Sequence, residues 1–263
     1  MDVEGQADWT YQQIWGDAEQ KDAGQFLANA AIQGPIKRCM SERGLTYPAK
    51  FTPLWLGYET NGTAGAWMGH LQEAPSTTER LLTEARKLER NPEPNPDLNK
   101  PGYRDAQAEC EKLSGDPDKV VKPPGTQELS GEYSAKVLNP VEDELGSLEP
   151  YTKCMGEAGV DLDGLDAEGY SALYMHLSSS MPGPPLPGEE PSEKWSRFLE
   201  YEAEALDADE ACRAEKYREG LAILEPRLRE FRAENSERLL ASERAWVELL
   251  QRARAQGYPQ TPQ

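Results

Sequence analysis

Two histidines in this 263-residue chain have surroundings that suit metal chemistry. Each lies close to a methionine, in the segments Trp67–His70 and Leu173–His176. A thioether sulfur beside an imidazole is a donor set that suits copper. The competing interpretation is packing, which we favour because methionine fills irregular core space. A copper site and a ligand or partner cleft remain as alternatives. The candidate residues are Trp67, Met68, His70, Tyr174, Met175 and His176, with His70 and His176 as the metal ligands.

The four cysteines stand singly along the chain, as Cys39, Cys110, Cys154 and Cys212. Zinc sites draw on close pairs such as Cys-x-x-Cys, so this spacing argues against zinc. A catalytic thiol is equally disfavoured. Structural disulfides are favoured, and four cysteines allow three pairings.

An internal repeat chooses among those pairings. The sequence IKRCMSERG at 36–44 matches YTKCMGEAG at 151–159, with a basic residue, Cys and Met in order and a Gly five after the Cys. Downstream, AWMGHL at 66–71 matches ALYMHL at 172–177, and the later cysteines end AQAEC and DADEAC. Three landmarks in the same order indicate two diverged copies of one unit. If each copy was once self-sufficient, Cys39 pairs with Cys110 and Cys154 pairs with Cys212.

The predicted fold is mainly α. Two diverged helical repeat units are joined by Pro-rich loops, each unit is closed by a disulfide, and a long C-terminal helix follows. The expected limits are an N-terminal segment at 1–16, the first Cys-Met unit at 17–115, a linker at 116–126, the second Cys-Met unit at 127–224, the C-terminal helix at 225–257 and a tail at 258–263.

Apolar spacing predicts a helix over 17–43 that ends at Gly44, with Pro35 starting a new helix or kinking this one. A second helix is expected from Ser76 to about Arg90. The strongest strand signal, at 54–58, predicts a short ribbon at most.

A long helix is expected to begin at Ser192 and to be interrupted by Pro226. Beyond Pro226 its apolar positions include Phe231 and Trp246, which are too large to leave in water. This helix must therefore cover its own chain or dock on a partner, and internal packing is favoured.

Charge excludes some partners. The net charge of −19 repels nucleic acid and anionic lipid over most of the surface. No apolar run is long enough to span a membrane, and the first residues lack a basic and apolar leader. The chain is then either cytoplasmic or the mature part of an exported protein, and the ordered cysteines favour export.

Enzyme signatures are missing: the chain contains no G-x-S-x-G, H-E-x-x-H, phosphate-binding or dinucleotide-binding glycine motif. A carboxylate pair for polymer hydrolysis stays open, because 47 acidic residues give many combinations and no spacing selects one. The acidic run at 161–168 does not follow the calcium-loop pattern, so a turn leading into a helix capped by Asp166 is preferred. No cofactor is predicted.

The Cys39-Met40 and Cys154-Met155 pairs, each with its later glycine, resemble a group of uncharacterised secreted proteins and lipoproteins of high-GC actinobacteria. The resemblance implies an extracytoplasmic helical protein associated with transport or cell-envelope signalling, with no catalytic residues to carry over. The chain departs from the common pattern at Val160-Asp161, where an aromatic residue is usual. The expected function is a non-enzymatic envelope binding or accessory protein with an envelope protein or small ligand as partner. The alternatives are a cell-wall polymer hydrolase and a copper-binding protein.

The disulfide prediction can be checked by mass spectrometry. The non-reduced protein should weigh about 4 Da less than the reduced protein, because two disulfides lack four hydrogens. Peptide mapping should link Cys39 to Cys110 and Cys154 to Cys212. Four free thiols in the isolated protein would contradict both the pairing and the export argument.

Overall fold

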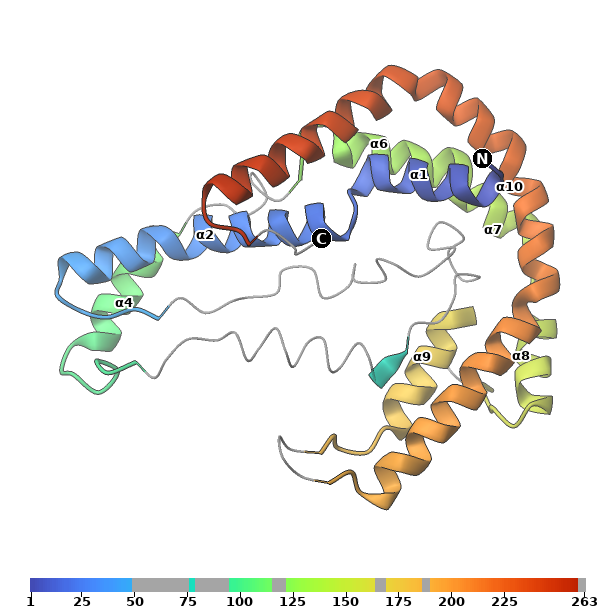
Figure 1. Cartoon of the computed structure of the whole chain (residues 1–263), viewed down its shortest axis with the longest axis horizontal. Helices are drawn as coiled ribbons and strands as arrows, with labels where there is room; N and C mark the ends of the chain where they lie inside the picture. The colour runs from blue at the N-terminus through green and yellow to red at the C-terminus, as the bar shows by residue number, and fades with distance from the viewer. Residues whose placement is uncertain (49–75, 79–94, 115–121, 164–168, 186–189, 260–263) are drawn as a thin grey trace. The chain divides into compact units, whose positions relative to one another are not determined.

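The structure is a computed structural model that describes residues 1–48, 76–78, 95–114, 122–163, 169–185 and 190–259 (Figure 1). Within these ranges the chain forms helices and no strand, which confirms the mainly α prediction. The ribbon expected at 54–58 and most of the helix expected from Ser76 lie outside the described residues. The elements are α1 (Val3–Trp15), α2 (Ala18–Glu42), α4 (Tyr103–Glu111), α6 (Thr126–Tyr133), the π-helical turn η2 (Ser134–Leu138), α7 (Asn139–Leu145), α8 (Glu149–Glu157), α9 (Gly169–Ser180) and α10 (Glu193–Ala255).

The chain forms two compact units, and each unit contains one of the predicted disulfides. The Cys154 unit comprises Met1–Tyr11, Thr60–Thr83 and Ser130–Ser236, and the Cys39 unit comprises Gln12–Glu59, Glu84–Leu129 and Glu237–Gln263. The pairings Cys154–Cys212 and Cys39–Cys110 are confirmed, each with 5.6 Å between Cα atoms. The limits of the compact units differ from the repeat limits expected from the sequence, because α1, α6 and α10 each contribute residues to both units.

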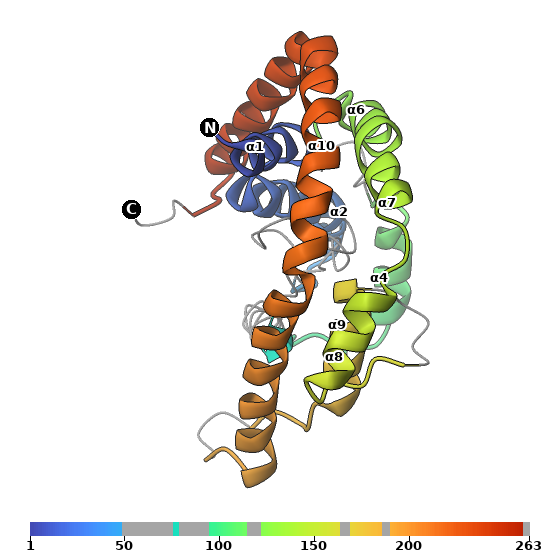
Figure 2. The same cartoon turned by 90° about the vertical axis from the view of Figure 1, so that its right-hand side faces the viewer.

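In the Cys154 unit, the stretch 130–157 runs antiparallel along α10. Figure 2 shows α7 and α8 beside this helix. As the residue numbers increase from 133 to 151, the numbers of their partners on α10 decrease. The paired residues, in order, are Tyr133 with Phe231, Glu144 with Arg227, Leu145 with Lys216 and Tyr151 with Asp209. α1 lies against α10 in the same unit, where the Arg232 guanidinium stacks 4.2 Å from the centre of the Trp9 ring.

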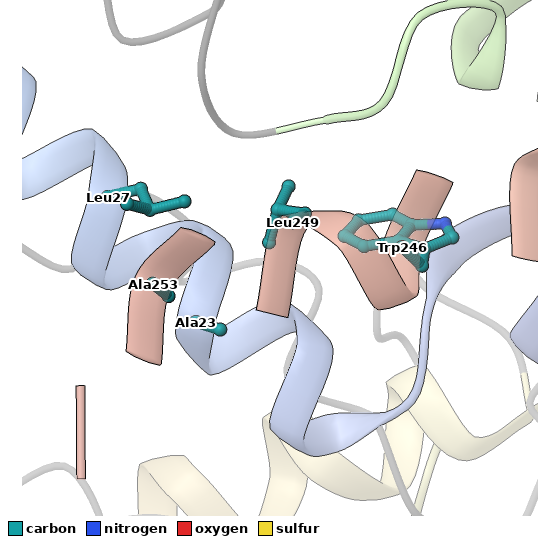
Figure 3. Packing of buried hydrophobic residues seen from close by; sticks show 5 residues of the cluster. All are labelled: Ala23, Leu27, Trp246, Leu249 and Ala253. Atoms are coloured by element: carbon teal, nitrogen blue, oxygen red, sulfur yellow. The ribbon is translucent and has the colours of Figure 1, made fainter. Parts of the chain in front are cut away.

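In the Cys39 unit, α2 packs against the last turns of α10. Figure 3 shows Ala23 and Leu27 of α2 beside Leu249 and Ala253 of α10, with Trp246 next to them. The Trp246 side chain is 1% exposed, and its indole N–H donates to the carbonyl oxygen of Ile14 at 3.1 Å. In the Cys154 unit Phe231 is equally buried. The prediction that these two residues pack internally is therefore confirmed.

Two prolines lie inside helices. The predicted interruption at Pro226 is wrong, because α10 continues through it from Glu193 to Ala255. Proline removes the backbone hydrogen bond to the carbonyl four residues earlier. In the same turn the Arg227 guanidinium donates to the Ile223 carbonyl at 2.9 Å. Leu224 and Leu228 on either side are fully buried, so core packing holds both halves in one helix. In the same way α2 contains Pro35 without a new helix starting there.

The segment at 1–16, expected to be a simple N-terminal segment, forms α1. Its buried residues include Ala7, Thr10 and Ile14 at helical spacing. Asp17 then caps α2, accepting a hydrogen bond from the Gln20 N–H at 2.8 Å while the Gln20 side chain accepts from the Asp17 N–H. Gly16 therefore forms the whole junction between the last residue of α1 and the cap of α2.

Replacement of Gly16 by alanine should destabilise the Cys39 unit for two reasons, the left-handed backbone at Gly16 and a clash of the new Cβ with Trp246. Gly16 has φ +79°, and an added Cβ would lie 2.8 Å from Cδ2 of Trp246. Gly102 has φ +77° with nothing within 4 Å of an added Cβ, so Gly102→Ala is the matched control. We expect a loss of about 1–2 kcal/mol for Gly102→Ala and about 1–3 kcal/mol more for Gly16→Ala in chemical denaturation. Equal losses would show that the contact with Trp246 is unimportant.

Candidate functional site

The repeated Cys-Met-x-x-x-Gly sequence forms a helix terminus in both units. Gly44 and Gly159 adopt φ +68° and +89°, the left-handed region that glycine enters without a steric penalty. The residue after each glycine donates its N–H back to the methionine carbonyl, from Leu45 to Met40 at 3.0 Å and from Val160 to Met155 at 2.9 Å. This is the Schellman arrangement.

The methionines of this motif are core residues. Met40 and Met155 are both fully buried, whereas the cysteines before them are partly exposed and bonded to a second helix. Both methionines therefore pack in the core. The Cys-Met-x-x-x-Gly motif is thus structural in both copies. The glycine ends the helix, the methionine packs in the core, and the cysteine joins the helix to a second one.

In the Cys39 unit, the disulfide attaches α4 to α2. The two helices pack on each other through a cluster of buried apolar residues: Ile36, Met40, Tyr103, Ala106 and Cys110. A buried carboxylate, Asp97, accepts a hydrogen bond from the Thr46 N–H at 2.7 Å and pairs with Lys100 at 2.6 Å. The hydrogen bond from Lys100, followed by that from Thr46, lowers the pKa of Asp97.

In the Cys154 unit, the disulfide attaches α8 to α10 beside a buried polar network. The Tyr151 hydroxyl donates to one oxygen of Asp209 at 2.8 Å, and the Arg213 guanidinium donates to the other at 3.0 Å. Burial is the main cause that raises the pKa of Tyr151. Arg213 also lies over the Tyr217 ring, 5.6 Å from its centre. Asp209 is thus a buried charge whose two oxygens are both paired.

A third buried carboxylate, Glu202, lies at a helix start in the Cys154 unit. It accepts hydrogen bonds from the Thr78 N–H at 3.0 Å and from the Ser76 hydroxyl at 3.3 Å. Thr77 and Thr78 are the first helical residues after Ser76, so the negative charge faces a helix N-terminus. In the part of the chain that the structure describes, the buried carboxylates Asp97, Glu202 and Asp209 are therefore all held by nearby donors, and nothing there supports a catalytic pair.

Of the predicted histidine and methionine sites, only the second repeat's residues can be placed. His176 lies on α9 with Nε2 at 2.6 Å from the hydroxyl of Tyr201 on α10. Burial first, and then the Asp161 carboxylate, raises the pKa of Tyr201. Tyr174 is partly buried, and Met175 is 44% exposed. Adjacent helical positions point about 100° apart, so His176 faces α10 while Met175 faces solvent.

The copper hypothesis is not tested by these positions. Trp67, Met68 and His70 lie outside the described residues, so the distance between His70 and His176 is not defined. Where side chains are described, no group of three His, Cys, Asp or Glu residues is placed to hold a metal ion. The hydrogen bond to Tyr201 also occupies one of the two nitrogens that His176 could offer. At 161–163 the Asp163 N–H donates to the Asp161 side chain at 3.0 Å, as in the predicted turn.

Comparisons of the chain with protein-family models, with curated proteins and with solved structures found no match. The resemblance to secreted actinobacterial proteins therefore stays a prediction. Among the described residues, no helix has the length and apolar character needed to cross a membrane.

Sequence reasoning did not single out Tyr201, Asp209 or Arg213. Asp209 and Arg213 are four residues apart on a predicted helix, which is the spacing of an ion pair. The sequence therefore contained the signal of an ion pair, but ion pairs of this spacing usually lie on a solvated helix face. The Asp209–Arg213 pair is buried where Tyr151 of α8 contacts it.

Lys21 on α2 is a further unusual group, and its titration can be tested. Burial lowers its pKa to about 8, against a smaller opposing effect of Asp17. The unfolded chain keeps this proton up to about pH 10.5, so between pH 8 and 10 it binds more protons than the folded chain. The free energy of unfolding should therefore rise with pH over this window.

The variant Lys21→Met should be more stable than the parent protein at pH 7, by about 1–3 kcal/mol, and should lose this rise with pH. Chemical denaturation at several pH values measures both effects. Lys153→Met is the control, since the Lys153 side chain is 76% exposed. Identical slopes for the parent and Lys21→Met would show that Lys21 titrates normally.

Proposed function

We propose that this protein is a non-enzymatic binding or accessory protein of the cell envelope that works outside the cytoplasm, secreted or lipid-anchored, in a transport or signalling system. The observation that supports this best is the use of the cysteines. All four form disulfides, and each disulfide attaches a Cys-Met helix to a second helix. Such structural disulfides persist in oxidising compartments.

The other reactive groups of the described residues support the same proposal. The buried carboxylates accept hydrogen bonds from backbone and side-chain donors, and His176 is hydrogen-bonded to Tyr201. The hydrolase and the copper-binding protein thus remain alternatives from the sequence, with no supporting observation among these residues.

The contact surface that we propose for a partner lies on α9. One side of this helix is buried through Ala172, Leu173 and Leu177, while Met175 projects into solvent. Methionine suits protein contacts because its flexible, polarisable side chain adapts to different surfaces. Tyr174 and His176, on either side of Met175 in the sequence, are both partly buried.

This surface can be tested by photo-cross-linking. A photoreactive amino acid at Met175 should give a discrete adduct with an envelope component in living cells. The control is the same residue at Leu113, which is 57% exposed and lies in the other unit. Mass spectrometry of the adduct identifies the partner. Fractionation of the cells shows in which compartment the protein lies. Equal adducts at both positions, or a protein found in the cytoplasm with reduced cysteines, would contradict the proposal.

A further inference from the structure

The two disulfides differ in how far the protein covers them. Cys110 is fully buried, and its partner Cys39 is partly exposed. Cys154 and Cys212 are both partly exposed. Reduction by a thiol begins with attack of a thiolate on one sulfur, so a disulfide with two accessible ends offers two routes of attack. The Cys39–Cys110 disulfide offers one route, at Cys39.

The sulfur that leaves also differs between the two disulfides. Attack at Cys39 expels the thiolate of Cys110, which lies in an apolar core. An apolar environment disfavours a thiolate, and exchange slows when the leaving thiolate is unstable. In the other disulfide both cysteines are partly exposed, and each is followed or preceded in the sequence by a cationic residue. These cations, Lys153 and Arg213, also pair with Glu157 and Asp209.

The helices that Cys154 and Cys212 join have other contacts. Tyr151 and Met155 of α8 are buried, and the Tyr151 hydroxyl donates to Asp209 of α10 at 2.8 Å. Just before α8, the Lys216 ammonium of α10 donates to the Leu145 carbonyl at 3.0 Å. None of these contacts involves Cys154 or Cys212, so they persist when the disulfide is open. The helices joined by the other disulfide also have non-covalent contacts, namely an ion pair between Arg43 and Glu109 at 2.8 Å and the apolar core that includes Cys110. The difference is that Cys110 itself lies in that core.

From these differences we propose that the Cys154–Cys212 disulfide is a reversible redox control, while the Cys39–Cys110 disulfide is permanent. Reduction opens the covalent link between α8 and α10 and leaves the helices of the Cys154 unit folded. The reductant is a dithiol. One of its thiolates attacks a sulfur of the pair to form a mixed disulfide, and its second thiol then displaces that sulfur. The dithiol is oxidised to a disulfide, and Cys154 and Cys212 take up two electrons and two protons. This inference does not depend on the proposed function.

The order of reduction tests the proposal on the full-length oxidised protein. Samples treated with dithiothreitol at pH 7 are quenched with acid at intervals, alkylated and mapped by mass spectrometry. We expect Cys154 and Cys212 to become alkylated with a half-time at least about tenfold shorter than that of Cys39 and Cys110. Far-UV circular dichroism should stay unchanged during this first phase. Prior or simultaneous reduction of Cys39–Cys110, or loss of helix in the first phase, would overturn the proposal.

A matched variant tests the remaining contacts. The double variant Cys154→Ser, Cys212→Ser should fold with the far-UV spectrum of the parent. Adding Tyr151→Phe should then lower its melting temperature further than the same substitution does in the disulfide-bonded protein. If the double variant fails to fold, the contacts at Tyr151 and Lys216 are insufficient and the switch is refuted, whatever the order of reduction in the parent protein.

Discussion

The backbone hydrogen bond from Leu45 to Met40, with its counterpart from Val160 to Met155, determines where each Cys-Met helix ends. A glycine in the left-handed conformation makes the bond possible, and a buried methionine holds that last turn on the core. The cysteine precedes the methionine by one position and is bonded to a cysteine of the partner helix.

Two consequences follow for the arrangement within the units. In the Cys39 unit the chain leaves α2 at Gly44. Two residues later, the Thr46 N–H donates a hydrogen bond to the Asp97 carboxylate. In the Cys154 unit α8 is held at α10 by both the disulfide and the Tyr151–Asp209 hydrogen bond. The repeated motif is the same, but the first disulfide has one cysteine buried in the core, whereas both cysteines of the second are partly exposed. This asymmetry is the physical basis for treating the two disulfides as different in redox behaviour.

The repeat brings together residue types that can bind a soft metal. Cysteine, methionine and histidine recur in both copies, which is the composition of a soft-metal site. In the described part of the chain the cysteines are bonded, Met40 and Met155 are buried, and His176 contacts Tyr201. Exposed Met175 is the member of this set whose position suits contact with another molecule, which is why the proposed partner surface is centred on it.

The sequence by itself determined the helical class, the disulfide pairing and the end of the first Cys-Met helix at Gly44, because these depend on local spacing and on a repeat within the chain. Tertiary structure alone decided three features: that Val3–Trp15 form α1, that α10 passes through Pro226, and that Asp209 is buried with Tyr151 and Arg213. Each depends on contacts between residues far apart in the chain, such as Ile14 with Trp246. Local propensity favours a break at a proline and a solvated face for an ion pair. Burial of Leu224, Leu228 and Asp209 against other helices outweighs that propensity, and no local pattern records which helices will meet.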